Sequence, residues 1–165
     1  MKTYTTTGSP IGELTLVADD RALCAVYMAE HKRRPGNSAF GTALAGGFAA
    51  AIEQLNEYFA GQRTEFELTT AAAGNTFQHR VWQQLMLIPY GETRSYGDLA
   101  ASLGDRSLAQ AVGAANGRNP LSIIVPCHRV LGATGSLVGY AGGLERKEYL
   151  LQLENPARVS TGLLF

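Results

Sequence analysis

Cysteine is scarce in this sequence, which has two such residues, Cys24 and Cys127, among 165. Two thiols cannot form the several disulfide bonds that hold small secreted domains together. No uninterrupted apolar stretch approaches the ~20 residues that span a bilayer, and the first residues lack the apolar segment of a secretory signal. We therefore exclude a disulfide-rich secreted protein and a membrane-spanning one, and expect a cytoplasmic protein without membrane contacts.

Net charge is absent too, because 14 Lys and Arg balance 14 Asp and Glu. The chain is 45% hydrophobic and 17% charged, which excludes a disordered protein. Neutrality by itself argues against a nucleic-acid partner, but the charge is uneven, at −2 over residues 1–78, +3 over 79–147 and −1 over 148–165. Six of the seven basic residues in the middle block are arginines, which suit phosphate and base contacts. The block fits a nucleic-acid surface or an ordinary one.

The chain divides at a linker over residues 69–74, so we predict domains at 1–74 and 75–165. Short apolar runs predict strands near Tyr4, over 12–18 and over 22–28, and Phe66 with Leu68 suggests another. Between them, apolar residues at helical spacing predict a helix that ends at Gly61. We expect an α+β protein whose small N-terminal α/β domain holds a short antiparallel sheet.

The second part has helical periodicity. One helix is predicted up to Pro89, and a second begins at Ser95, where Asp98 completes an N-cap. A Gly-containing turn follows, and Ser107 with Gln110 resembles a capping box that opens a third helix. Helix, short turn and helix is the outline of a helix-turn-helix, here in a mainly helical, winged-helix-like domain, although most such pairs only pack together.

The third predicted helix is built almost entirely of small residues, among them Ala109 and Gly113. Small side chains fill a core poorly, but they let a backbone approach another surface closely. That surface is either a DNA groove or another helix.

The segment Pro126-Cys127-His128-Arg129-Val130 carries the chemistry. The apolar residues before it predict a buried strand, and Pro126 makes its end rigid. A thiol is nucleophilic as a thiolate, and a nearby imidazole is the usual means of forming one. The competing interpretation is an inert, buried cysteine. Glu154, at the end of the last predicted helix, is either a third group that orients His128 or a solvated carboxylate.

Two further segments accompany this motif. Asn119-Pro120 predicts a turn, and Asn119 can bridge two segments through its side chain. The loop Gly139-Tyr140-Ala141-Gly142-Gly143 suits closure over a flat ligand. With the Ser95-Tyr96 helix start and the cysteine motif, these segments resemble the O6-alkylguanine-DNA alkyltransferases, also called methylated-DNA–protein-cysteine methyltransferases, over the whole C-terminal half.

The resemblance implies a role for each matching residue. Cys127 takes the alkyl group from O6 of guanine, and from O4 of thymine, as a stable thioether, so each molecule reacts once. His128 removes the thiol proton through a water and Glu154 holds the imidazole. Tyr96 donates toward the leaving guanine, with help from Lys147, and Asn119 ties the recognition helix to the active-site strand. The pocket is then lined by Val130, Tyr140, Ala141 and Gly142.

The resemblance also implies a double-stranded DNA partner that carries alkylated bases, bound in its minor groove, with the target base flipped out. No cofactor is expected, and we expect a monomer, with cooperative binding along DNA left open. The predicted DNA contacts are Tyr96, Arg106, Ala109, Gln110, Gly113, Arg118 and Arg129.

The sequence departs from the family at two positions. Gln110 stands where an arginine usually fills the space left by the flipped base, and Arg106 is placed to compensate. Gln110 has an alternative role as the third residue of the Ser107 capping box. Ala141 replaces a pocket serine. The structural zinc of some relatives lacks ligands here, since Cys24 and His31 are the only candidates in the N-terminal part.

Two other functions compete with repair. An alkyltransferase-like binding protein recognises alkylated guanine without reacting, but such relatives replace the cysteine that Cys127 retains. A Cys-His hydrolase normally separates its two residues widely in sequence, whereas here they are adjacent. In a strand, adjacent side chains point to opposite faces, which favours a water between Cys127 and His128 over direct contact.

Overall fold

Three antiparallel strands open the structure, a computed structural model that describes residues 1–158. Gly12, at φ 102°, closes the first turn with a hydrogen bond to the Ser9 carbonyl. A short fourth strand pairs in parallel with the first, so the predicted antiparallel sheet is present and has a parallel edge. The sheet order is β3-β2-β1-β4, and its strands are β1 (Lys2–Thr7), β2 (Leu14–Asp19), β3 (Ala22–Met28) and β4 (Thr42–Ala43).

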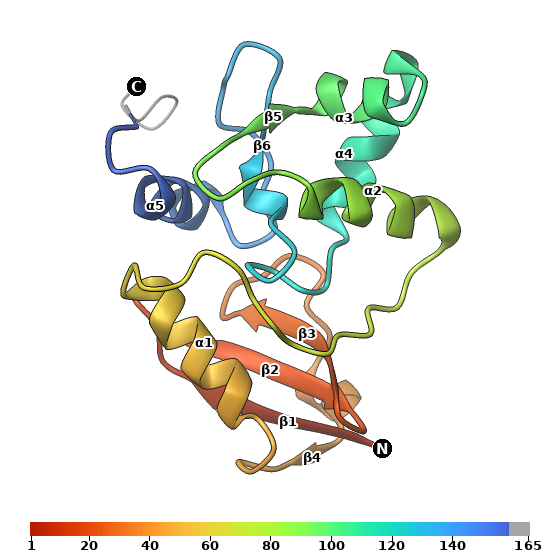
Figure 1. Cartoon of the computed structure of the whole chain (residues 1–165). Helices are drawn as coiled ribbons and strands as arrows, with labels where there is room; N and C mark the ends of the chain where they lie inside the picture. The colour runs from red at the N-terminus through yellow and green to blue at the C-terminus, as the bar shows by residue number, and fades with distance from the viewer. Residues whose placement is uncertain (159–165) are drawn as a thin grey trace.

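One helix, α1 (Ala49–Phe59), covers a face of this sheet (Figure 1). It buries Leu55 and Tyr58 and ends as predicted, since Gly61 has φ 75°. The strand predicted at Phe66 and Leu68 is wrong. Both side chains pack on the core. The backbone of this segment pairs with β3 at an isolated bridge, Leu23 with Thr70, and does not continue as a strand. The segment from His31 to Gly47 is a loop with a short 3-10 turn and β4 within it.

The C-terminal half begins with two capped helices, α2 (Thr76–Met86) and α3 (Tyr96–Ser102). The predicted cap of α3 is confirmed: the Ser95 hydroxyl accepts from the Asp98 N–H, and the Asp98 carboxylate accepts from the Ser95 N–H. An equivalent box, formed by Asn75 and Gln78, starts α2. Local sequence fixes both helix starts, but only the cap of α3 was predicted.

The capping box predicted at Ser107 is wrong. Asp105 instead accepts from both the N–H and the hydroxyl of Ser107, and a 3-10 turn, η2 (Arg106–Leu108), precedes α4 (Ala109–Gly117). Asp105 competes successfully because a carboxylate two residues ahead reaches these donors without distortion. Gln110 is therefore free of a capping role, and the helix-turn-helix outline of α3 and α4 remains.

The buried strand predicted before Cys127 is also wrong. Residues 121–126 are buried but form a tight turn, with bridges at Val26–Leu121 and Ser122–Val125. Ile123 has φ 75°, a conformation that β-branched residues rarely adopt. Cys127 begins the 3-10 turn η3 (Cys127–Arg129), and the chain then enters β6 (Val130–Leu131), which pairs in parallel with β5 (Arg94–Ser95).

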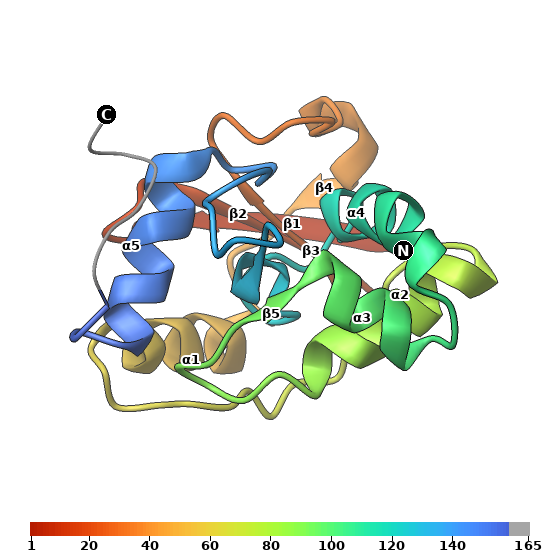
Figure 2. The same cartoon turned by 90° about the horizontal axis from the view of Figure 1, so that it is seen from above.

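The last helix, α5 (Leu144–Glu154), lies beside the end of α1 in both views (Figures 1 and 2). One hydrophobic cluster joins both halves of the chain, including Leu16 and Leu55 of the first and Val81 and Leu150 of the second. Within the described residues, no helix is long and apolar enough to cross a membrane. The predicted C-terminal domain extends to residue 165, and 159–165 lie outside the described residues.

Candidate active site

Cys127 lies at the start of η3, where its side chain is buried, with the residue 4% exposed. A 3-10 helix has three residues per turn, so successive side chains diverge by about a third of a turn. The expectation that Cys127 and His128 point to opposite faces of a strand is therefore replaced by this turn. It separates the thiol from the two side chains that follow, both of which reach toward α5.

His128 and Glu154 form the pair predicted from the sequence. His128 Nε2 lies 2.7 Å from Glu154 Oε2, and both side chains are buried. Because a carboxylate only accepts, Nε2 carries the proton and Nδ1 keeps its lone pair. Nδ1 has no hydrogen-bond partner among residues 1–158. The ring is therefore held as a neutral base with one free nitrogen.

Glu154 accepts from three further groups besides His128. Arg129 donates to both carboxylate oxygens, at 2.7 and 2.9 Å, and the Tyr58 hydroxyl donates to Oε2 at 2.6 Å. The Gly91 N–H donates to Oε1 at 3.3 Å. Burial by itself would raise the pKa of Glu154, but the interactions with His128 and Arg129 outweigh it and hold the pKa well below its ordinary value. The carboxylate is thus ionised at neutral pH.

The prediction that Arg129 contacts DNA is wrong. Its side chain is buried, its Nη1 donates to the Ile88 carbonyl at 2.8 Å, and its guanidinium lies over the Tyr90 ring. The planar guanidinium matches the Glu154 carboxylate in a two-point contact, which explains why arginine occupies this buried position. Arg129 therefore neutralises the active-site carboxylate from a buried position.

Burial sets the resting protonation of the two reactive groups. It raises the pKa of the Cys127 thiol, against smaller opposing effects of Asn119 and Lys147. It lowers the pKa of His128, although Glu154 opposes that change. At neutral pH the site therefore holds a protonated thiol and a neutral imidazole, so the thiol needs a base when it reacts.

Lys147 is fully buried, and its ammonium group donates to three backbone carbonyls, those of Val130 at 2.6 Å, Val138 at 2.7 Å and Gly139 at 3.1 Å. Burial lowers its pKa to about 8. These contacts use all three N–H donors of the ammonium group. Because Val130 belongs to β6 and the other two carbonyls to the loop before Tyr140, Lys147 joins that loop to β6. Its predicted help to Tyr96 stays a prediction.

Two buried asparagines hold the segment that carries the thiol. Asn119 donates to the Val125 carbonyl at 2.9 Å and accepts from the Leu121 N–H, which agrees with its predicted bridging role. Asn116, on α4, donates to the Cys127 carbonyl at 3.3 Å. The end of α4 is therefore tied to the turn on both sides of Pro126.

A hollow of about 170 Å³ lies between the start of α3, α4 and the loop at Tyr140. Tyr96 and Tyr140 line it, and so does Asn116, which donates to the Cys127 carbonyl at 3.3 Å, so the hollow adjoins the turn that carries the thiol. Of the four predicted pocket residues, Tyr140 and Ala141 line the hollow, whereas Val130 and Gly142 are buried and do not. The full lining is Lys32, Arg33, Tyr96, Gly113, Asn116, Gly117, Gly139, Tyr140 and Ala141.

The residues predicted to contact DNA on α4 and at its ends are exposed or half-buried. Gln110 is exposed, and Ala109 and Gly113 are half-buried on the same helix. Arg106 and Arg118, at either end of α4, are exposed as well. A Cβ at Gly113 would lie 3.7 Å from the Tyr96 ring, so a larger residue there would crowd the pocket.

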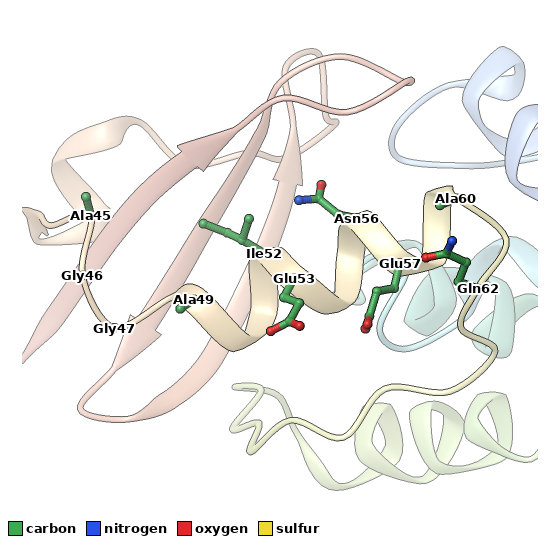
Figure 3. A pocket seen from close by; sticks show the side chains of 10 residues that line it. All are labelled: Ala45, Gly46, Gly47, Ala49, Ile52, Glu53, Asn56, Glu57, Ala60 and Gln62. Carbon is green, nitrogen blue, oxygen red and sulfur yellow. The ribbon is translucent and has the colours of Figure 1, made fainter.

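A larger hollow, of about 730 Å³, lies elsewhere, along α1 and the segment before it (Figure 3). Its lining of small residues and exposed polar side chains includes Glu53 and Asn56 but none of the groups around Cys127. Chemistry therefore assigns the active site to the smaller hollow. In the described part of the chain, no three His, Cys, Asp or Glu side chains are grouped to hold a metal ion.

Sequence reasoning missed several members of the site. Tyr58 is 96 residues from Glu154, and no local pattern connects them. Asn116 looked like one more residue of a small-residue helix. Lys32 and Arg33 belong to a polar segment without a recognisable motif, and their basic charge was the available indication.

Two family models match the chain, the ribonuclease-like domain of 6-O-methylguanine DNA methyltransferase over residues 2–72 and its DNA binding domain over 76–156. A methylated-DNA–protein-cysteine methyltransferase of Mycobacterium tuberculosis (strain H37Rv) is 51% identical over 151 residues, covering 92% of this chain and 91% of the relative. The constitutive enzyme of Bacillus subtilis (strain 168) is 41% identical over 169 residues, covering 93% and 96%.

The structural comparison agrees. A crystal structure of Mycobacterium tuberculosis OGT in complex with DNA superposes with a TM-score of 0.89 at 49% identity, covering 93% of each chain. These findings confirm the resemblance seen in the sequence. The chain belongs to the 6-O-methylguanine DNA methyltransferase family, the methylated-DNA–protein-cysteine methyltransferases that repair O6-methylguanine.

Proposed function

We propose that Cys127 is the residue of this chain that accepts the methyl group from O6-methylguanine in double-stranded DNA. The observation that carries the proposal is the His128–Glu154 pair beside Cys127, with its 2.7 Å contact and its free Nδ1. A neutral imidazole with one unpaired nitrogen next to a protonated thiol is a base placed for a single proton transfer.

The reaction follows from the resting protonation states. His128 Nδ1 takes the thiol proton, with a water as the relay, and Glu154 with Arg129 stabilises the imidazolium that forms. The thiolate sulfur bonds to the methyl carbon as the carbon–O6 bond breaks, and that electron pair stays on guanine. The Tyr96 hydroxyl donates toward the developing negative charge. The product is a thioether, which has no easy leaving group, so each molecule reacts once.

The hollow receives a base that has left the helical stack. The target atom is inaccessible within a duplex, and flipping it out costs a few kcal/mol. Tyr96 and Tyr140 give the hollow flat walls, and the small residues of α4 allow close approach to the minor groove. Arg106, Gln110 and Arg118 are the proposed DNA contacts on this side, together with Ala109 and Gly113.

The remaining expectations belong to the same proposal. The protein acts as a monomer on duplex DNA, in the cytoplasm, where its two unpaired cysteines stay reduced. O4-methylthymine is a second substrate of the same pocket. The domain boundary at residue 74 is also a prediction.

Intact mass spectrometry tests the assignment. The protein is mixed with a duplex that carries one O6-methylguanine, and we expect a gain of one methyl group per molecule. Cys127→Ser should bind the duplex and gain nothing. Binding by the wild type without any mass gain would mean recognition without repair and would overturn the assignment, and repeated turnover would point to a hydrolase-like enzyme.

A further inference from the structure

The rim of the active-site hollow includes two basic residues of the N-terminal half. Lys32 and Arg33 follow β3, yet they line the same hollow as Tyr96 and Ala141. The Lys32 N–H donates to the Ala141 carbonyl at 2.8 Å, which fixes this segment to the pocket loop. The N-terminal half thus borders the pocket directly.

Both side chains are available to a ligand. Lys32 and Arg33 are exposed, and no hydrogen bond or ion pair occupies either side chain in the part of the chain that the structure describes. The nearby carboxylate, Glu30, pairs with Arg146 instead. Arg118 is exposed too, and it lines a second hollow of about 440 Å³ together with Lys32 and Arg33. Three unneutralised cations therefore meet at the end of α4.

The backbone of Arg33 supports a specific role. Its φ is 58°, in the left-handed region that non-glycine residues avoid unless their surroundings enforce it. In this conformation the guanidinium lies against the helix end, where a Cβ on Gly117 would be 3.7 Å from Nη1. Gly117 borders both hollows, so the guanidinium lies where the two meet.

We propose that Lys32 and Arg33 bind the phosphates that flank the flipped nucleotide. This inference rests on the proposed function. A base that enters the hollow remains joined to its sugar and its two phosphates, and these must stay at the mouth. Cations at that mouth would approach these phosphates most closely when the base is inside, so they favour the flipped state over the stacked one.

The test compares duplex affinities in a Cys127→Ser background, which prevents reaction during the measurement. Lys32→Ala keeps the backbone N–H that binds Ala141, and Arg33→Asn uses a residue that tolerates positive φ. For the double variant, we expect the Kd for an O6-methylguanine duplex to rise about tenfold near ~0.1 M salt. The slope of log K against log salt should decrease by about 1.8, or ~0.9 for each phosphate.

Two controls separate this role from others. Arg21→Gln removes a charge in the β2–β3 turn, outside both hollows, and should leave the Kd unchanged. The unmodified duplex should lose less affinity than the damaged one, since its bases stay stacked. Equal losses on both duplexes would overturn the proposal in favour of general backbone contacts.

The variants are also made with Cys127 intact, so that transfer can be followed. With the free O6-methylguanine base they should react at the wild-type rate, whereas at saturating duplex they should react more slowly, because a smaller fraction of the bound bases is flipped. Slow reaction with the free base would show a structural role and overturn the proposal. If the variants bind and react like the wild type, the rim proposal fails while the proposed function stands. If the wild type gains no methyl group, both fail.

Discussion

At the scale of residues, the site depends on one buried carboxylate. An isolated carboxylate in a protein interior is strongly unfavourable, and removing one partner from a buried ion pair costs about 3–5 kcal/mol. Glu154 is tolerated because His128, Arg129, Tyr58 and the Gly91 N–H all donate to it. The family motif pointed to His128 and Glu154, but Tyr58 and Arg129 follow only from the three-dimensional packing.

Tyr58→Phe tests how much the N-terminal half contributes to this network. The change removes the 2.6 Å hydrogen bond to Oε2 and leaves the His128 and Arg129 contacts in place. We expect the free energy of unfolding to fall by about 1.5–3 kcal/mol, as for hydrogen bonds to charged groups, while the rate of methyl transfer changes little. Urea denaturation and single-turnover mass measurements report the two quantities.

Tyr90→Phe is the matched control, because its hydroxyl makes only a long 3.5 Å contact with the Leu153 carbonyl. Its loss should change the unfolding free energy by much less. An equal loss in the two variants would mean that the Tyr58–Glu154 bond contributes nothing special.

His31 gives the protein a pH-dependent stability outside the active site. Burial, with the charges of Arg146 and Arg34, lowers its pKa to about 4, and its Nδ1 accepts from the Met28 N–H. Between pH 6.5 and 4 the unfolded chain binds a proton here that the folded chain does not, so stability is lost as pH falls through this window. The expected contribution is about 2 kcal/mol at pH 5 relative to pH 7.

His31→Asn keeps an acceptor near the Met28 N–H but does not titrate. Denaturation at pH 7 and pH 5 should therefore show a smaller acid loss in the variant than in the wild type. His128, whose pKa is also lowered, contributes in the same direction to both proteins and cancels in the comparison. An equal loss of unfolding free energy between pH 7 and pH 5 in the two proteins would contradict the prediction.

At the scale of elements, local sequence determined some structures and misled for others. The cap of α3 depends on Ser95 and Asp98 alone and was predictable, whereas the box at Ser107 failed because Asp105 offered a competing acceptor. The apolar run before Cys127 has the composition of a strand, yet it folds as a buried turn. An apolar composition predicts that a segment is buried. Whether the segment forms a strand also depends on a neighbouring strand that can pair with it, and that is a property of the whole fold.

Gln110 on α4 offers a gain-of-function prediction. The residue is exposed and makes no cap, so Gln110→Arg can add a guanidinium without disturbing the fold. We expect tighter duplex binding, with a salt slope steeper by about 0.9 if the new charge reaches a phosphate. Gln110→Ala should slow transfer about tenfold, or about 1.4 kcal/mol, if the side chain fills the space left by the base.

Single-turnover rates at saturating duplex separate flipping from binding in both variants. Ala111→Gln is a suitable control, because it places the same amide on the next exposed position of α4. Rates that are unchanged in Gln110→Ala would show that this chain flips the base without help from position 110.

At the scale of the whole molecule, the N-terminal half completes the active site. Val26 of β3 donates to the Pro120 carbonyl at 2.9 Å, and Tyr58 reaches Glu154 from α1. A Cβ at Gly142 would collide with the Met28 sulfur, so the pocket loop packs directly on β3. The two halves were separable in the sequence by composition, but their shared hydrophobic cluster could not be foreseen, because its contacts join distant parts of the chain.

The shared cluster predicts that both halves unfold together. Leu16→Ala truncates a fully buried side chain of the N-terminal sheet and should lower the unfolding free energy by about 2–5 kcal/mol. Trp82, the sole tryptophan, lies on α2 and donates to the Ala115 carbonyl, so its fluorescence reports the C-terminal half. In urea, we expect Leu16→Ala to lower the midpoint of the Trp82 fluorescence transition by as much as it lowers the midpoint of the circular-dichroism transition. A Trp82 midpoint that stays at the wild-type value would show that the C-terminal half, with Cys127, is stable without the sheet beneath it.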